Sequence, residues 1–138
     1  MGVLAGRQLS IKWALALCYH VGWRQTKLTK AVAVMTAESD RYTEAYNTND
    51  NGTTDRGLYQ INSIHDNQIS PDEAFKPIPN ATYAYALYRS RIAQGLDGFS
   101  PWYAYGGARY LLAYAATALV QSLGTWKKRI LRVEKELG

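Results

Sequence analysis

The clearest periodic pattern in the chain is a stripe of mostly apolar residues with helical spacing. Its members are Leu28, Val32, Met35 and Ser39. Ala31 and Val34 widen the stripe. Residues three and four apart share one face of an α-helix, so the pattern predicts a helix over about residues 26–39 with one buried face.

Further helices are predicted on both sides of this segment. They cover about residues 9–21, 80–94, 108–123 and 125–137. Ser10, Asn80 and Thr125 stand at three of the starts, where a side-chain oxygen accepts a hydrogen bond from the first helical turn. Gly22 and Gly95 follow two of these helices and mark their ends. The chain is therefore predicted to be mostly helical.

Residues 42–64 follow a different, polar pattern. Asp50-Asn51-Gly52 lies between short polar and β-branched runs, a setting in which Asn-Gly is a strong hairpin signal. Residues 66–79 contain three prolines and are expected to form a loop with one short turn. These elements predict a single domain over residues 1–138. Its fold class is α+β, mostly α, with a small antiparallel β hairpin beside a helical bundle.

Composition excludes several classes of protein. The chain has 138 residues, of which 47% are hydrophobic and 20% charged, which suits one folded domain. Cys18 is the only cysteine and there are two histidines, so neither an internal disulfide nor a metal site or cofactor is expected. The longest uncharged stretch, residues 110–126, contains polar residues, so no membrane span is predicted. The apolar run at residues 13–17 is too short for a signal peptide, and synthesis in a reducing cytoplasm is expected.

The net charge of +5 is unevenly distributed. Residues 1–30 hold five bases and no acid, residues 31–122 hold six bases and nine acids, and residues 123–138 hold five bases and two acids. Basic ends favour an anionic polymer or surface as partner, and nucleic acid, teichoic acid, peptide stems and anionic lipid all qualify. A nucleic-acid partner is not expected, because the bases lie apart in the sequence and no groove-reading motif is present.

Two carboxylates stand out by their surroundings. Glu38 lies at the end of the predicted helix 26–39, where the helix dipole disfavours an anion and apolar neighbours limit hydration. Both effects raise the pKa of a carboxyl group, as a general acid requires. Asp55 follows the hairpin turn among hydrogen-bonding residues that favour the ionised form. Contrasting surroundings of this kind supply one site with an acid and an anion.

The segment that joins these carboxylates carries a specific motif. Glu38-Ser39 is followed by Asn-Thr-Asn-Asp-Asn-Gly-Thr-Thr-Asp at residues 47–55 and by Gly-Leu-Tyr-Gln-Ile-Asn-Ser at residues 57–63. This arrangement resembles the lysozyme superfamily, including soluble lytic transglycosylases and lysozyme-like domains of phage endolysins and tail proteins. Residues 103–107 are similar to the Ala-Tyr-Asn-x-Gly segment of the transglycosylase-like branch, with Gly106 in place of the usual asparagine. The lack of disulfides and a late Pro-Trp are most similar to phage lysins of actinobacterial hosts.

The resemblance implies a lysozyme-like fold and a glycosidase that cleaves peptidoglycan between N-acetylmuramic acid and N-acetylglucosamine. Glu38 would protonate the leaving oxygen as general acid. Asp55 would stabilise the oxocarbenium-like centre or attack it as nucleophile, or the acetamide or 6-hydroxyl group of the substrate would take that place. The 6-hydroxyl route is that of a lytic transglycosylase and yields 1,6-anhydro products. The candidate substrate-binding residues are Ser39, Thr54, Gln60, Asn62, Trp102 and Tyr105.

The alternatives are a lytic transglycosylase and a non-catalytic structural module of a phage particle. Gln60 and Asn62 would bind acetamide groups or would instead satisfy backbone groups of the small sheet. His65 is expected to be a surface residue. The protein is expected to be a monomer or a domain of a larger phage protein. It would be made in the bacterial cytoplasm without a signal peptide and act at the cell wall as a lysin or virion-associated enzyme.

Overall fold

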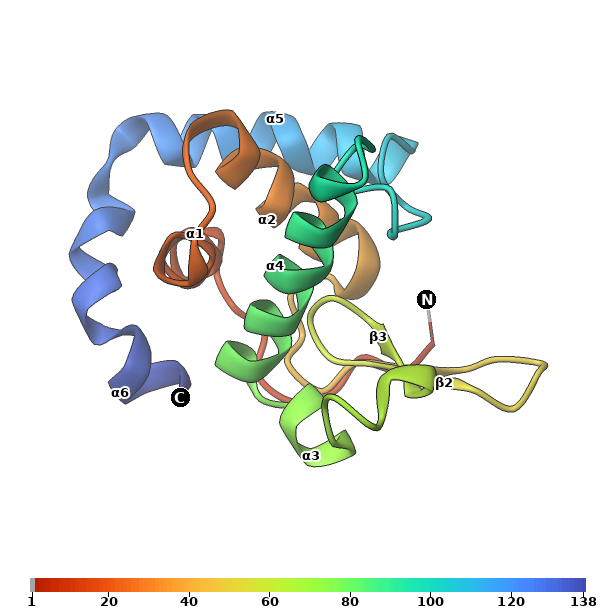
Figure 1. Cartoon of the computed structure of the whole chain (residues 1–138). Coiled ribbons are helices and arrows are strands. Elements are labelled where there is room, and N and C mark those ends of the chain that lie inside the picture. The colour runs from red at the N-terminus through yellow and green to blue at the C-terminus, as the bar shows by residue number, and fades with distance from the viewer. Residues whose placement is uncertain (1) are drawn as a thin grey trace.

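A computed structural model describes residues 2–138 of the chain. Its four longest helices are α1 (Ile11–Val21), α2 (Gln25–Ser39), α4 (Pro77–Ala93) and α5 (Ala108–Leu123). Helix α2 packs against α1 and α5, and α4 crosses the molecule from the side of the sheet toward α5 (Figure 1). The predicted cap of the first helix is confirmed, because the Ser10 Oγ accepts a hydrogen bond of 3.1 Å from the Trp13 amide.

A small antiparallel sheet lies beside the helices, as predicted. Its strands β1 (Tyr46–Thr48), β2 (Thr54–Arg56) and β3 (Ile61–Asn62) are arranged in the order β1-β2-β3. The turn between β1 and β2 contains Gly52 at φ +84°, a conformation that glycine adopts without strain. The 3-10 helix η1 (Ser63–His65) follows β3 directly. The predicted fold class, α+β and mostly α, is confirmed.

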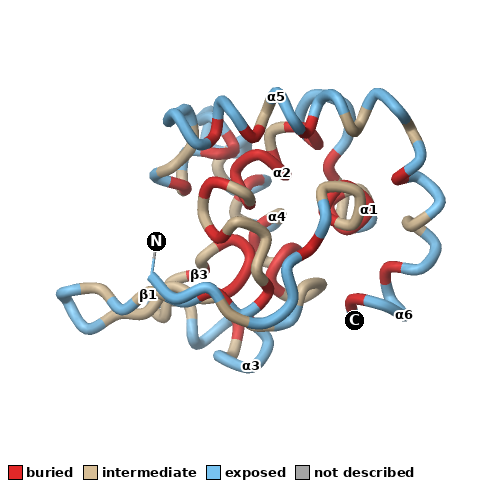
Figure 2. Tube along the Cα trace, turned by 180° about the vertical axis from the view of Figure 1, so that it is seen from behind, coloured by how far each residue is buried: buried red, intermediate tan, exposed pale blue. Residues whose placement is uncertain are grey.

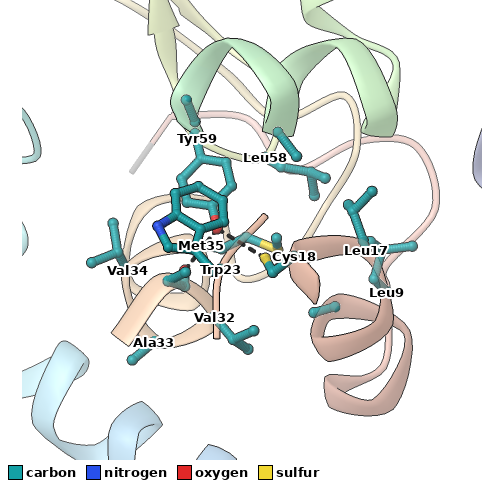
Figure 3. Close-up of a cluster of buried hydrophobic side chains, with 14 of the residues drawn as sticks. Leu9, Leu17, Cys18, Trp23, Val32, Ala33, Val34, Met35, Leu58 and Tyr59 are labelled. Atoms are coloured by element: carbon teal, nitrogen blue, oxygen red, sulfur yellow. Dashed lines mark hydrogen bonds between the residues drawn. The ribbon is translucent and has the colours of Figure 1, made fainter. Parts of the chain in front are cut away.

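The core lies where α1, α2 and the segment after β2 meet (Figure 3). Tyr59 is fully buried at its centre and donates a hydrogen bond of 2.8 Å from its hydroxyl to the Ala31 carbonyl. The Cys18 Sγ lies 3.1 Å from the same hydroxyl. Burial raises the pKa of the Cys18 thiol to about 12, so this cysteine is a neutral core residue at physiological pH.

The start of α4 differs from the prediction. The short helix α3 (Pro71–Ala74) forms near the expected turn, but α4 then begins at Pro77, so the prediction that Asn80 caps this helix is wrong. Asn80 is fully buried inside the helix. Its Nδ2 donates to the carbonyl oxygens of Arg56 and Ala74 at 3.0 and 2.7 Å, and its Oδ1 accepts from the Tyr59 amide at 2.9 Å. Asn80 therefore joins the sheet to the helical part.

The end of the chain also differs from the prediction of one helix capped by Thr125. A 3-10 helix, η2 (Thr125–Arg132), is followed by a short α6 (Val133–Leu137). Gly124 precedes η2 at φ +77°, and Thr125 is the first residue of the segment rather than its cap. Trp126, Val133 and Leu137 are buried in the core. Among residues 2–138, no helix has the length and apolar character that crossing a bilayer requires.

Candidate active site

Glu38 and Asp55 line one groove. Glu38 occupies the last turn of α2 and Asp55 the middle of β2. Two adjoining hollows of about 200 and 220 Å³ share both carboxylates as well as Gln60 and Tyr103. The groove therefore continues on both sides of the carboxylate pair, as a site for a chain-like substrate requires.

The two halves of the groove have different linings. One half adds apolar and aromatic residues together with two polar ones, and these are Tyr59, Ile61, Asn62, His65, Leu87, Pro101 and Trp102. The other half adds no aromatic residue, and it adds the polar Asn47 and the base Arg109 together with Ala37 and Ala104. Glu38 and Asp55 thus lie where an aromatic half meets a polar half.

Burial raises the pKa of Glu38, as the sequence predicts. The Ala104 backbone amide opposes this by donating to the Glu38 Oε1 at 3.4 Å, and the positive charge of Arg109 also lowers the pKa. The negative charge of Asp55 raises the pKa further. Because burial is the largest of these causes, the net effect keeps a proton on Glu38 to higher pH than on an exposed glutamate.

Asp55 has polar surroundings of the kind expected. Its Oδ1 accepts a hydrogen bond of 2.8 Å from Asn62 Nδ2 on β3, and its Oδ2 accepts one of 3.2 Å from Asn49 Nδ2 in the hairpin turn. Both amides also donate to the Thr53 Oγ1, at 3.2 Å from Asn62 and 3.0 Å from Asn49. This network of four hydrogen bonds orients the Asp55 carboxylate in the groove.

Asn62 and Gln60 lie in the groove but also serve the sheet. The Asn62 Oδ1 accepts from the Ile64 amide at 2.9 Å and so caps η1, while its amide nitrogen holds Asp55. The Gln60 Nε2 donates to the carbonyl oxygens of Ala45 and Gly57 at 3.1 and 3.0 Å. The sequence left open whether these side chains bind acetamide groups or satisfy groups of the protein. In the structure, both amide nitrogens donate to groups of the protein.

Two predicted substrate contacts lie elsewhere. Ser39 is fully buried, and its hydroxyl donates to the Met35 carbonyl at 3.1 Å and accepts from the Arg41 amide at 3.2 Å. The prediction that Ser39 binds substrate is therefore corrected, because its side chain stabilises the end of α2. Thr54 precedes Asp55 on β2, and alternate residues of a strand point to opposite faces of the sheet. Since Asp55 faces the groove, Thr54 points away from it.

The aromatic residues of the segment 97–107 divide between groove and packing. Trp102 lines the groove, and its Nε1 donates to the Tyr59 carbonyl at 3.0 Å, which holds the indole in place. Tyr105, predicted as a groove residue, instead packs its ring on Phe99 and Tyr110. Tyr103 was not among the predicted substrate-binding residues, yet it is fully exposed beside the carboxylates.

Two hydrogen bonds of the Tyr105 hydroxyl connect it to Asp97 in the same segment and to α2. The Tyr105 hydroxyl donates to the Asp97 Oδ2 at 3.0 Å and accepts from the Lys30 Nζ at 3.3 Å. Tyr105 directly follows Ala104, whose amide contacts Glu38. The predicted binding role of Tyr105 is therefore replaced by a positioning role.

His65 and Arg109 are groove residues that sequence reasoning missed. His65 was expected at the surface, but it lines the aromatic half, and its Nδ1 lies 2.9 Å from the Tyr83 hydroxyl. Arg109 comes from the first turn of α5, far from the motif in sequence. The only feature of the sequence that could have placed His65 in the groove is its position directly after the motif.

The arrangement is of a kind that glycosidases use. Most of them cleave a glycosidic bond with two carboxyl groups, one with a raised pKa and one ionised, and Glu38 has a raised pKa here. Within residues 2–138, no group of three or more His, Cys, Asp or Glu side chains is placed to hold a metal ion. The groove thus contains the residue types that a two-carboxylate mechanism requires.

Comparison with known families agrees with this assignment. Residues 15–104 match the lysozyme-like domain family, and the chain belongs to that family. The matched range contains both carboxylates, the sheet and the segment up to Ala104. Neither the search of curated proteins nor that of solved structures returned a match. The protein is an enzyme that acts on peptidoglycan, as a glycosidase or a lytic transglycosylase.

Proposed function

We propose that the protein cleaves the β-1,4 bond between N-acetylmuramic acid and N-acetylglucosamine, with Glu38 as general acid and Asp55 as the stabilising carboxylate. The observation that carries this proposal is that the two groups share one groove in contrasting surroundings. Burial raises the pKa of Glu38, whereas two amide donors orient Asp55.

The first step uses the proton of Glu38. It passes to the glycosidic oxygen while the bond from that oxygen to C1 of the muramic acid breaks, which leaves positive charge on the ring. The Asp55 carboxylate stabilises this charge. In the second step the Glu38 carboxylate accepts a proton from a water molecule, the water oxygen bonds to C1, and a reducing muramic acid end is formed.

The hydrogen bonds of Asp55 bear on its role. Each of its oxygens accepts an amide hydrogen bond, at 2.8 and 3.2 Å, and this lowers the nucleophilicity of the carboxylate. Electrostatic stabilisation is therefore favoured over covalent attack. The same observation favours the second candidate function, in which the 6-hydroxyl group of the muramic acid attacks C1, its proton passes to Glu38 and a 1,6-anhydro ring forms.

The groove suggests how the glycan binds. Sugars present apolar faces that pack on aromatic rings. Trp102 offers such a ring on one side of the carboxylates, and Tyr103 offers one where the two hollows meet. Asn47 and Arg109 on the other side offer donors for acetamide and carboxylate groups. The proposed arrangement places sugar units on both sides of the scissile bond.

Mass spectrometry of digested peptidoglycan tests the reaction. Reducing muramic acid ends indicate hydrolysis, and 1,6-anhydro ends indicate the transglycosylase. Glu38→Gln is expected to lower the rate by about 10²–10⁴-fold, because the general acid is lost. Glu44→Gln is the matched control, since Glu44 is exposed on the segment before β1. Wild-type protein that binds purified walls without releasing fragments would instead support a non-catalytic structural module.

We also propose a phage context for this enzyme. The motif is similar to that of disulfide-free phage lysins, and Cys18 is buried and neutral, which suits a reducing cytoplasm. The protein would act at the wall as a lysin or as part of a virion, as a monomer or a domain of a larger chain. Detection of the chain in purified particles by mass spectrometry would distinguish a virion-associated enzyme from a free lysin.

A further inference from the structure

Helix α5 exposes an apolar face that the rest of residues 2–138 leaves uncovered. Leu112, Leu119 and Leu123 are 76%, 66% and 66% exposed. Their separations of seven and four residues place them on one side of the helix, with the exposed Leu111 at the edge. These four residues are called the leucine face below. The opposite side of α5 packs on α2, so the leucine face points outward (Figures 1 and 2).

The residues that precede and follow the leucine face in the chain carry positive charge. Residues 106–132 contain five bases and no acid. Lys127 and Lys128 are exposed directly after α5, and Arg109 lies in its first turn. The neighbouring Arg129 and Arg132 lie over the Trp13 ring at 5.5 and 5.7 Å from its centroid. An occupant of this face must therefore be apolar at its centre and anionic around it.

This requirement distinguishes among possible occupants. In a second copy of the chain packed antiparallel on α5, Arg109 of one molecule would lie opposite Lys127 and Lys128 of the other, and a parallel arrangement would place like charges side by side. A polyanion such as teichoic acid would pair with the bases but leave the leucines in water. An anionic bilayer meets both requirements, because its acyl boundary takes up the leucines and its phosphate groups pair with the bases.

We propose that the leucine face and the adjoining Lys127 and Lys128 dock this enzyme on the surface of an anionic lipid bilayer. The leucines enter the boundary between headgroups and acyl chains, while the lysines bind phosphate groups. The small sheet and its hairpin lie at the other end of the molecule from α5 (Figures 1 and 2). Docking through α5 therefore holds that wall of the groove away from the lipid and toward the peptidoglycan.

Co-sedimentation with unilamellar vesicles tests the proposal. The protein is expected to bind vesicles that contain phosphatidylglycerol and not vesicles of phosphatidylcholine alone. Leu119→Ser with Leu123→Ser is expected to lower the partition coefficient about tenfold or more, and so is Lys127→Glu with Lys128→Glu. The controls are Ile64→Ser, which removes an exposed apolar residue beside the sheet, and Lys76→Glu with Arg89→Glu, which changes the net charge equally. Both controls should bind as the wild type does.

Digestion of lipid-free peptidoglycan by the leucine variant should equal that of the wild type, which shows that the fold and the groove are intact. Three results would overturn the proposal. The first is no binding to anionic vesicles. The second is binding that depends on the lysines but is unchanged in the leucine variant, which indicates a polyanion site. The third is a dimer, detected by light scattering, that the leucine variant abolishes while vesicles remain unbound.

Discussion

The side chain of Asn62 holds the carboxylate of Asp55 across two neighbouring strands. Its Nδ2 lies 2.8 Å from the Asp55 Oδ1, and the two residues are register partners in the β2–β3 pair. Because β3 is held in turn by the cap that Asn62 forms on η1, one residue controls both the strand end and the carboxylate. The sheet therefore determines where the Asp55 carboxylate lies in the groove.

Replacement of Asn62 should impair catalysis more than folding. Asn62→Ala removes the 2.8 Å bond to Asp55 and is expected to lower kcat about tenfold, because a bond to a charged group is lost. Steady-state digestion of a soluble glycan fragment measures kcat and KM. Asn67→Ala at an exposed turn after η1 is the matched control. Unchanged kcat in a folded Asn62→Ala variant would show that catalysis does not depend on this contact.

Glu38 should reduce the stability of the folded protein near neutral pH. Burial raises its pKa in the folded state, so the folded protein binds this proton more tightly than the unfolded chain does. The stabilising contribution of the proton is complete below the ordinary glutamate pKa of about 4.3 and is lost as pH rises through the raised value. Glu38→Gln is therefore expected to raise Tm at pH 7 and to leave it unchanged at low pH.

Thermal unfolding followed by circular dichroism across pH measures this difference. Glu44→Gln supplies the control for loss of one exposed carboxylate. If Glu38→Gln has the Tm of the wild type at every pH, the carboxyl group of Glu38 is better hydrated than the structure indicates. The proposal that Glu38 is the general acid would then be contradicted.

Charges on the two sides of the groove should shift the pKa of Glu38 in opposite directions. The positive charge of Arg109 lowers this pKa and the negative charge of Asp55 raises it. Arg109→Gln is therefore expected to raise the pKa of Glu38, and Asp55→Asn to lower it. Nuclear magnetic resonance titration of the side-chain carboxyl carbon reads the value directly. Shifts of the same sign in both variants would contradict the arrangement, and Lys76→Gln, outside the groove, should cause none.

Gly57 should be one of the positions least tolerant of a side chain. It has φ +75°, and an added Cβ would collide with the Ala74 carbonyl oxygen and the Asn80 side-chain nitrogen. Gly57→Ala is expected to cost about 3 kcal/mol or more of the free energy of unfolding, because strain and collision combine. Gly52→Ala is the control, since Gly52 has φ +84° with open space around it. It should cost only about 1–2 kcal/mol.

Urea unfolding measures both variants. If both variants lose the same free energy of unfolding, the Asn80 side chain can move away from an added Cβ at little cost. A larger loss at Gly57 supports the interpretation that this junction of sheet and helices is closely packed and holds the groove in shape.

Local signals in the sequence predicted most of the elements. The helix over residues 108–123 has the expected bounds, because Gly107 precedes it and Gly124 follows it in a left-handed conformation. The hairpin formed at its Asn-Gly turn. The prediction for Asn80 was wrong because its side chain bonds to residues outside its own helix. These partners, Arg56, Ala74 and Tyr59, lie 24, 6 and 21 residues earlier in the sequence. Polar side chains that bond across the fold give no local signal.

The sequence by itself determined the carboxylate pair, since Glu38 and Asp55 belong to one continuous motif whose helix end and hairpin are local structures. Only the tertiary structure decided which other residues meet them. It turned Ser39 into the core, brought Tyr103 and Arg109 from distant segments to the groove, and left the leucines of α5 facing outward. The physical reason is that hydrogen bonds and turns act over a few residues, whereas burial and groove lining depend on how whole elements pack together.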